Sequence, residues 1–285
     1  MTRTVYVNGE YLSETDAKIS IFDRGFLFAD GVYEVVSVLG GKLLDFAGHM
    51  KRLRRSLAEL ELPSPAEDDE LLAIHRRLVS ENGLDEGLIY MQVTRGAADR
   101  DFLFPPKGTR PSLVLFTQAV ALRDKPSAET GLRIASVPDL RWGRRDIKTV
   151  QLLYPSMAKM DAKRRGADDA WLVEDGVVTE GSSNNAHIVT ADGVLVTRDL
   201  SHSILHGITR AAVLRLAAEE NIPVEERNFT LDEAKSAAEA FITSASSFVL
   251  PVVEIDLHPI GDGKPGPIAK RLRQIYIAES EKTAI

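Results

Sequence analysis

The second half of the chain contains four short strand-like segments separated by turn residues, and this feature constrains the fold most strongly. The segments are 170–173, 177–179, 187–190 and 194–197. Asp175-Gly176 and Asp192-Gly193 lie between neighbouring segments, and Asp-Gly pairs are typical of tight turns between paired strands. Further strands are expected at 132–137, 240–244 and 250–257, and helices at 152–165, 209–218 and 268–277. The second half is therefore predicted to form a sheet of short strands with a few helices beside it.

The first half mixes strands and helices. Alternating segments on either side of Asn8-Gly9 predict a hairpin. Further strands are expected at 32–38, 42–44, 88–94 and 112–119, and helices at 49–60 and 68–82. In the strand 32–38, Tyr33, Val35 and Ser37 share one face, and the residues between them share the other.

These segments predict an α+β protein of two domains. A smaller N-terminal α+β domain would cover 1–118, an interdomain linker 119–125, and a larger C-terminal domain 126–285. A chain of 285 residues is long enough for both. The segment 22–31 carries three phenylalanines between Asp-containing turns, and it is expected to be an ordered loop packed on the core.

Composition excludes several classes of protein. The chain has no cysteine, which excludes disulfides, thiolate catalysis and cysteine-ligated zinc. Its six histidines are scattered along the chain, and no transition-metal site is expected. The net charge of −7 argues against nucleic acid as a partner. No apolar stretch approaches the roughly 18 residues of a membrane span, and no signal peptide is recognisable, so a cytoplasmic protein is expected.

Lys148 is the candidate for covalent chemistry. It lies between Ile147 and Thr149, where a lysine is most often a solvated side chain. A lysine that attacks a carbonyl must lose its proton, which requires partial burial or a nearby cation. Arg144 and Arg145 would supply that cation. The sequence is therefore compatible with a lysine that binds an aldehyde.

Three polar segments further along could complete a site for a flat, phosphorylated ligand. Small residues after Glu180, at 181–184, let such a ligand approach the backbone. The carboxylate could hold a pyridine nitrogen protonated through a charge-assisted hydrogen bond. The helix start at Ile208-Thr209 and the turn at 243–247 could bind an anion. Each segment also has an ordinary explanation: a strand-end acid, a threonine N-cap and a polar turn.

Taken together, motifs in order along the chain resemble those of the fold-type IV pyridoxal-phosphate enzymes, the class IV aminotransferase family. They are 23–25 with 30–34, 49–53, 146–148, 180–184, and 207–210 with 243–244. The resemblance implies a small α/β sandwich domain followed by a larger pseudo-barrel domain. It implies pyridoxal 5'-phosphate as cofactor, with Lys148 as the Schiff-base lysine and Glu180 at the ring nitrogen. The other cofactor contacts that it implies are Arg52, Ser183, Asn184, Leu205, Ile208, Thr209, Ser244 and Ala245.

Within that family, the motifs are most similar to those of the D-amino-acid transaminases. This similarity implies amino transfer between a D-amino acid, such as D-alanine or D-glutamate, and a 2-oxo acid. The substrate-binding positions that it implies are Arg24, Tyr33, Val35, Ser37, Arg100 and Phe102. Arg100 would reach the site of a partner subunit, which implies a homodimer. Phe102 and Ser37 stand where the family has a histidine and a lysine, so relaxed specificity with some (R)-amine turnover is expected.

The resemblance also implies a mechanism and leaves rivals open. The amino donor would displace Lys148 from the cofactor, and the freed amine would move the Cα proton as general acid and base. Arg100 would clamp the substrate carboxylate. The rivals are an (R)-selective amine transaminase, a branched-chain L-amino-acid aminotransferase, an aminodeoxychorismate lyase and a cofactor-binding protein without activity. The serines after Glu180 favour the D-amino-acid reading, and Ser37 and Phe102 argue against the lyase.

Overall fold

The computed structural model describes residues 2–285, which separate into two compact units. Unit 1 contains the chain up to Ala121, together with Ile147–Gln151 and Glu281–Ile285. Unit 2 contains Leu122–Asp146 and Leu152–Ser280. Lys148 therefore belongs to unit 1, although the chain has already entered unit 2 before reaching it. Each unit combines a sheet with helices, which confirms the predicted α+β class.

Unit 1 is built on a six-stranded antiparallel sheet in the order β2-β1-β6-β5-β3-β4. Its strands are β1 Thr4–Val7, β2 Glu10–Ser13, β3 Gly31–Leu39, β4 Lys42–Leu43, β5 Glu86–Thr94 and β6 Ser112–Ala119. Asn8 and Gly9 connect β1 and β2 at φ of 51° and 107°, the positive values that an Asn-Gly hairpin turn requires. The predicted hairpin and the four further strands are thus confirmed.

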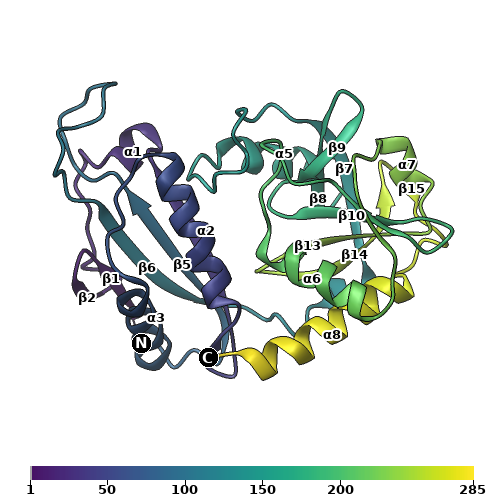
Figure 1. Cartoon of the computed structure of the whole chain (residues 1–285), viewed down its shortest axis with the longest axis horizontal. Helices are drawn as coiled ribbons and strands as arrows, with labels where there is room; N and C mark the ends of the chain where they lie inside the picture. The colour runs from purple at the N-terminus through teal and green to yellow at the C-terminus, as the bar shows by residue number, and fades with distance from the viewer. Residues whose placement is uncertain (1) are drawn as a thin grey trace. The chain divides into compact units, whose positions relative to one another are not determined.

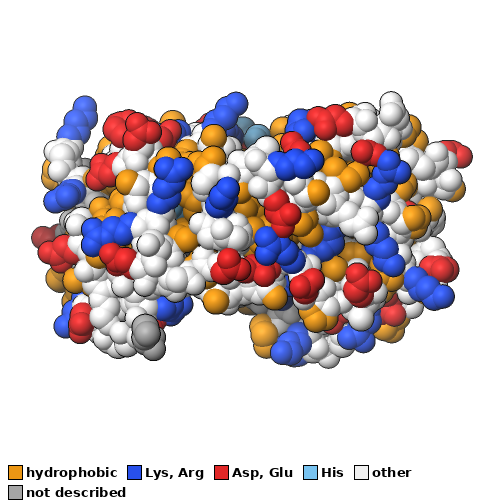
Figure 2. Space-filling model, turned by 90° about the horizontal axis from the view of Figure 1, so that it is seen from below, with side chains coloured by type: hydrophobic (Ala, Val, Ile, Leu, Met, Phe, Trp, Pro, Cys, Tyr) orange, Lys and Arg blue, Asp and Glu red, His pale blue; other side chains and the backbone are white. Residues whose placement is uncertain are grey.

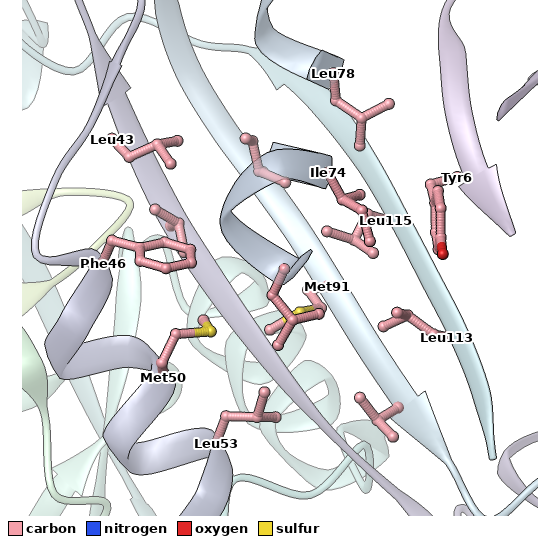
Figure 3. Close-up of a cluster of buried hydrophobic side chains, with 14 of the residues drawn as sticks. Tyr6, Leu43, Phe46, Met50, Leu53, Ile74, Leu78, Met91, Leu113 and Leu115 are labelled. Carbon is pink, nitrogen blue, oxygen red and sulfur yellow. The ribbon is translucent and has the colours of Figure 1, made fainter. Parts of the chain in front are cut away.

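Helices α2 (Phe46–Glu59) and α3 (Asp68–Glu81) cover one face of this sheet (Figure 1). Their leucines and methionines pack on strand residues such as Met91 and Leu115 in a single buried cluster (Figure 3). The alternation along β3 directs Val36 and Val38 into this core and leaves Tyr33 half-buried on the other face. The predicted division of β3 into two faces is therefore confirmed.

The segment 22–31 contains a short helix, α1 (Arg24–Phe28), and the prediction of a core-packed loop is wrong. Asp23 caps this helix, because its side chain accepts a hydrogen bond of 2.8 Å from the Gly25 N–H. Phe22 and Phe26 are 50% and 70% exposed. The Asp23 cap, and not the burial of phenylalanine, decides the local structure.

Unit 2 contains a nine-stranded mixed sheet in the order β12-β11-β10-β13-β14-β7-β8-β9, with β15 paired to β14. Its strands are β7 Leu132–Pro138, β8 Asp169–Glu174, β9 Val177–Gly181, β10 Asn185–Val189, β11 Leu195–Thr197, β12 Val224–Glu226, β13 Glu239–Ser244, β14 Phe248–Ile255 and β15 His258–Pro259. The Gly181 N–H donates to the Asn184 carbonyl at 2.8 Å, which ties the end strand β9 to the residue before the interior strand β10. The sheet therefore curls back on itself, as expected for a pseudo-barrel.

Helices and two clusters of buried side chains complete unit 2. The helices are α4 Pro126–Thr130, α5 Leu153–Arg164, α6 Ile208–Glu219, α7 Leu231–Lys235 and α8 Pro267–Thr283, whose last residues belong to unit 1. One cluster centres on Trp171, whose ring meets Phe229 edge-on with centroids 6.2 Å apart. The other packs α5 on the sheet through Ala158 and Ala162. The sequence did not predict α4, α7, β12 or β15, because segments this short have little periodicity.

Two features of the surface bear on partners. On the face drawn in Figure 2, positive and negative side chains are interspersed, and no broad surface of one sign is visible there. No helix among the described residues is long and apolar enough to cross a membrane.

Candidate functional site

The residues predicted to bind cofactor and substrate divide between the two units. Unit 1 carries Arg24, Tyr33, Val35, Ser37, Arg52, Arg100, Phe102 and Lys148. Unit 2 carries Glu180, Ser183, Asn184, Leu205, Ile208, Thr209, Ser244 and Ala245. The contacts of these residues are therefore described within each unit separately.

Lys148 is fixed to unit 1 by its backbone and leaves its amine available. Its carbonyl accepts a hydrogen bond of 3.0 Å from the Tyr33 N–H, and its own N–H donates to the Ser56 hydroxyl at 3.3 Å. The neighbouring Ile147 is buried in the core of unit 1. Lys148 Nζ lies 4.2 Å from the centre of the Tyr33 ring, and no carboxylate of the described chain pairs with it. A half-buried amine without a carboxylate partner is suited to attack an aldehyde.

Arg144 and Arg145 were expected to act as cations beside Lys148, and the structure does not support this role. The Arg144 guanidinium lies 3.0 Å from the Asp146 carboxylate. Arg145 bonds to Glu174 at 2.8 Å. Both arginine charges are thus balanced by acids within unit 2.

Arg52 is held by a buried acid that the sequence did not single out. Arg52 donates to Glu34 through Nε at 2.8 Å and Nη2 at 2.7 Å, and His49 Nδ1 donates to the same carboxylate at 2.7 Å. Glu34 is fully buried. Burial alone would raise the pKa of Glu34, but Arg52 and His49 together lower it to about 2. Glu34 on β3 therefore holds the side chains of both His49 and Arg52.

Arg24 secures the loop that follows β5. Its Nε donates to Asp30 at 2.7 Å, and its Nη1 donates to the carbonyls of Asp101 and Leu103 at 2.8 and 3.3 Å. Phe102 on this loop is 79% exposed, and the Arg100 guanidinium lies 5.3 Å from its ring centre. Arg24 thus holds the backbone of the loop that presents Arg100 and Phe102.

The half-exposed face of the unit 1 sheet carries an aromatic row. Tyr33 stacks on Tyr90 with centroids 5.5 Å apart, and Tyr90 stacks on Phe116 at 4.9 Å. The Tyr90 hydroxyl donates to Gln92 at 2.8 Å, and burial raises its pKa. Sequence reasoning missed Tyr90 and Phe116. The alternation along β5 carried the signal for Tyr90, which lies between the buried Ile89 and Met91 and therefore faces the other side of the sheet. Only the register of the folded sheet places Phe116 beside it.

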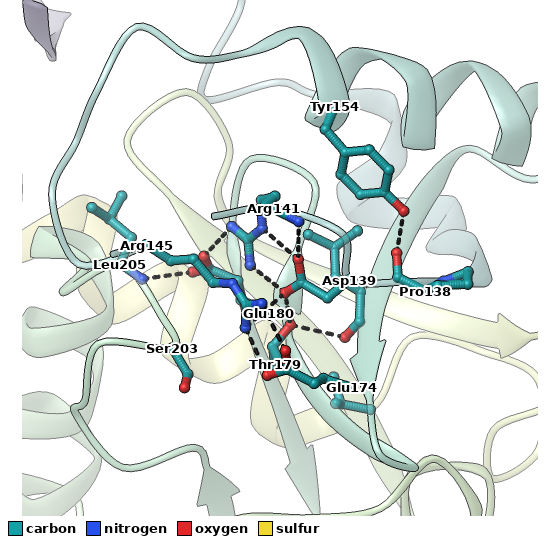
Figure 4. A network of polar contacts seen from close by, with 12 residues as sticks. Pro138, Asp139, Arg141, Arg145, Tyr154, Glu174, Thr179, Glu180, Ser203 and Leu205 are labelled. Carbon is teal, nitrogen blue, oxygen red and sulfur yellow. Dashed lines mark hydrogen bonds and ion pairs between the residues drawn. The ribbon is translucent and has the colours of Figure 1, made fainter. Parts of the chain in front are cut away.

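The Glu180 carboxylate accepts hydrogen bonds from three donors of unit 2 (Figure 4). Its Oε1 accepts from Arg141 Nη1 at 2.6 Å. Its Oε2 accepts from Asn185 Nδ2 at 3.0 Å and from the Leu205 N–H at 3.1 Å. Burial raises the pKa of Glu180, and the charge of Arg141 opposes that rise. Three donors leave one acceptor direction of the carboxylate, on Oε1, for a further donor.

The turn after Glu180 is tied down by a second buried acid, Asp169. Ser182 Oγ donates to it at 2.5 Å and Asn184 Nδ2 at 3.0 Å. The Ser183 side chain is exposed, whereas its neighbours on both sides are buried. Sequence reasoning missed Asp169, which the fold brings to the turn from the start of β8.

The start of α6 has the character of an anion site. Gly207 is the N-cap, and no side chain caps the helix, so the first N–H groups of α6 are open to a ligand. Thr209 is therefore inside the first turn, and the ordinary explanation of this residue as an N-cap is wrong. Ser244 ends β13, and its Oγ lies 3.4 Å from Ser246 Oγ. Backbone N–H groups and hydroxyls of this kind suit a phosphate.

Gly207 allows Asn185 to reach Glu180. A Cβ at Gly207 would lie 2.0 Å from Asn185 Oδ1, and Asn185 also donates to the Leu205 carbonyl at 2.9 Å. We expect Gly207→Ala to displace Asn185 and to weaken cofactor binding roughly tenfold, the effect of one lost hydrogen bond to a charged group. Gly143→Ala is the matched control, because a Cβ there meets nothing within 4 Å. Cofactor titration followed by absorbance measures both, and equal affinities in the two variants would contradict the assignment.

The donor sets of the two units fit pyridoxal phosphate. Unit 1 offers an amine without a carboxylate partner at Lys148. Unit 2 offers a buried acid with a remaining acceptor direction at Glu180 and an uncapped helix start at Ile208. An aldehyde, a pyridine nitrogen and a phosphate require these three kinds of group.

Comparisons with known proteins agree with this reading. The model of the family Amino-transferase class IV matches residues 31–255. The D-alanine aminotransferase of Staphylococcus aureus (strain N315) is 40% identical over 272 residues, 95% of each chain. That of Bacillus licheniformis is 37% identical over 283 residues, 98% of this chain and 99% of its own.

Solved structures of branched-chain amino acid aminotransferases share the fold. The T.th. protein complexed with N-(5'-phosphopyridoxyl)-L-glutamate matches with a TM-score of 0.88 and 27% identity, covering 100% of this chain and 98% of that one. The Thermoproteus uzoniensis protein with norvaline matches with a TM-score of 0.86 and 28% identity, covering 97% and 94%. With the family model matched over most of its length, this chain belongs to the class IV aminotransferase family.

Proposed function

We propose that the protein is a pyridoxal-phosphate-dependent transaminase that exchanges an amino group between a D-amino acid and a 2-oxo acid. The observation that carries the proposal is the Glu180 carboxylate, which is buried, held by three donors and left with one acceptor direction. A protonated pyridine nitrogen is the donor that this direction suits. When bound, the cofactor ring accepts the electron pair released at the substrate Cα.

The chain's own residues divide the remaining work. Lys148 Nζ would hold the cofactor through its aldehyde and would move the proton of the substrate Cα. Arg52, the first N–H groups of α6 with Thr209, and the Ser244-Ala245 turn hold the phosphate. Leu205, Ser183 and Asn184 would contact the ring. Tyr33, Val35 and Ser37 line the substrate side.

The choice of a D-amino acid is supported by the sequence relatives. D-Alanine aminotransferases at 37–40% identity cover nearly all of the chain. The two branched-chain enzymes described above are 27% and 28% identical. Phe102 replaces a hydrogen-bond donor at the substrate carboxylate, so we propose relaxed specificity that extends to (R)-amines. The cytoplasmic location stays a prediction from the sequence.

We also propose a homodimer, in which Arg100 binds the substrate carboxylate in the site of the partner subunit. Support comes from the exposed apolar side chains around α1 and the loop that Arg24 holds. They are Ile19, Ile21, Phe22, Phe26, Phe102, Leu103 and Phe104, which are between 46% and 79% exposed. A group of exposed apolar side chains of this kind marks a protein interface more often than free surface. Sedimentation analysis of the holoenzyme tests this, and a monomer at micromolar concentration would contradict it.

Single-donor spectroscopy tests the function. Enzyme loaded with pyridoxal phosphate is mixed with D-alanine, L-leucine or (R)-1-phenylethylamine, without any 2-oxo acid. We expect D-alanine to remove the visible band of the lysine-bound cofactor, (R)-1-phenylethylamine to remove it more slowly, and L-leucine to leave it. Loss of the band with L-leucine alone would identify a branched-chain enzyme, and no loss with any donor a protein without this activity.

A variant of the exposed loop tests the specificity. Phe102→His restores a donor at the substrate carboxylate, and we expect it to raise the rate ratio of D-alanine to (R)-1-phenylethylamine roughly tenfold, the effect of one charge-assisted hydrogen bond. Phe104→His on the same exposed loop is the control. An unchanged ratio in Phe102→His would contradict the assignment of Phe102 to the substrate pocket.

A further inference from the structure

We propose that Arg141, clamped by Asp139, is a positioning residue that keeps the buried Glu180 carboxylate ionised and oriented for the ring nitrogen of the cofactor. The inference rests on the proposed function. It adds Arg141 as the residue that sets the charge of Glu180, the proposed partner of the ring nitrogen. It concerns unit 2 alone.

Arg141 is the only cation that contacts Glu180 within the described residues. Its Nη1 donates to Glu180 Oε1 at 2.6 Å, while the two donors on Oε2, from Asn185 and Leu205, are neutral. Arg141 thus bonds to the same oxygen that keeps an acceptor direction for the ring nitrogen. This arrangement lets one guanidinium fix both the charge and the rotation of the carboxylate.

Asp139 fixes Arg141 in turn. Arg141 donates to it through Nε at 2.9 Å and Nη2 at 2.7 Å, a bidentate pair that leaves Nη1 for Glu180 (Figure 4). Asp139 has a fully buried side chain and also accepts from Thr179 Oγ1 at 2.7 Å. The row of three charges is therefore held at both ends by the sheet, since Thr179 and Glu180 are neighbours on β9.

The charges around Glu180 explain why the guanidinium is needed. Burial favours the neutral acid, and Asp139 adds a negative charge behind Arg141. Both effects raise the pKa of Glu180, and Arg141 opposes them. Arg145 lies 3.4 Å from Asp139 and pairs with the half-exposed Glu174, so it does not replace Arg141 at Glu180. Without Arg141, no charge would oppose these two effects, and both favour a proton on Glu180.

Proton uptake on cofactor loading tests the proposal. Pyridoxal phosphate is titrated into apoenzyme by calorimetry at neutral pH in two buffers of different ionisation enthalpy. In Arg141→Met, Glu180 already holds a proton, so we expect loading to take up fewer protons than in the unmodified enzyme, by up to one per site. Arg145→Met is the matched control, because it removes an arginine from the same network without touching Glu180. Protons exchanged at Lys148 on loading are the same in every variant, so they do not affect the difference in proton uptake between variants.

Two further variants show whether Arg141 acts through Glu180. Arg141→Lys, which keeps the charge, should restore most of the proton uptake. In a Glu180→Gln background, Arg141→Met should change nothing further. Equal uptake in Arg141→Met, Arg145→Met and the unmodified enzyme would overturn the proposal.

A measurement on the unmodified enzyme covers the case in which Arg141→Met does not fold. The infrared difference between unmodified and Glu180→Gln apoenzyme should contain no band of a protonated carboxyl group at neutral pH. Such a band would overturn the proposal without any change at Arg141. If the unmodified enzyme binds no pyridoxal phosphate, the proposed function itself fails, and this outcome is separate from both of the others.

Discussion

Lys148→Ala is expected to lower the transamination rate by roughly 10⁴-fold, the upper range for loss of a positioned proton-transfer group. The same change should remove the visible band of the lysine-bound cofactor, because position 148 then has no amine. The structure gives Lys148 Nζ an aromatic neighbour and no carboxylate partner in the described chain, so the amine is not needed for an ion pair of the fold. Stopped-flow absorbance with D-alanine and steady-state rates measure the two effects.

Lys51→Ala is the control for this prediction. Lys51 is an exposed lysine on α2 of the same unit, and its loss should change neither the rate nor the spectrum. The stability of Lys148→Ala should stay close to that of the unmodified protein. If Lys148→Ala kept both its turnover and its visible band, the covalent role would belong to another residue.

Glu34→Gln is expected to destabilise unit 1 by about 3–5 kcal/mol, because it leaves the buried Arg52 without its counter-charge. Glu34 is fully buried, and both His49 and Arg52 donate to it. The pKa of this carboxyl falls from 4.5 to about 2 in the folded protein. A lowered folded pKa means that the ionised form stabilises the fold above pH 4.5, and that this contribution is lost as the pH falls toward 2. Denaturant unfolding at a series of pH values should show that the difference in free energy of unfolding between the unmodified protein and Glu34→Gln becomes smaller over that range.

An exposed ion pair of unit 1 provides the comparison. Glu81 bonds to Arg77 at 2.6 Å on α3, with side chains 34% and 54% exposed. Glu81→Gln should cost only about 0.3–0.5 kcal/mol, the usual value of such a pair on a helix surface. Equal losses for Glu34→Gln and Glu81→Gln would show that the buried cluster is not a structural element of unit 1.

Much of the fold followed from local patterns. The hairpin at Asn8-Gly9, the two faces of β3 and the Asp-Gly turns at 175–176 and 192–193 depend on neighbouring residues, and the structure contains all of them. The short helices α1 and α7, of five residues each, escaped prediction because they contain less than two turns of periodicity. In α1 a local signal was nevertheless present: the Asp23 side chain caps the helix, and this cap decides the structure of the segment more than its phenylalanines do.

The candidate site was only partly predictable. Lys148 and Glu180 stand in short motifs that chemistry makes conspicuous, and their family was recognisable from the order of those motifs. The residues that give them their properties are distant in sequence or look ordinary. Glu34 meets Arg52 across β3 and α2, and Asp169 reaches the turn at 182–184 from β8. Arg141 looked like one of several arginines before Lys148, until the fold paired it with Glu180 and the others with different acids.

The sequence by itself determined the α+β class, most of the strands and helices, the family and the reactive groups, because these depend on periodicity, turn chemistry and short motifs. Only the tertiary structure decided which charges are paired. A buried carboxylate takes its protonation state from the donors that reach it, and those donors come from other strands and loops. Burial strengthens the interaction between such a carboxylate and its donors, and a residue is buried only after the sheets and helices have packed together.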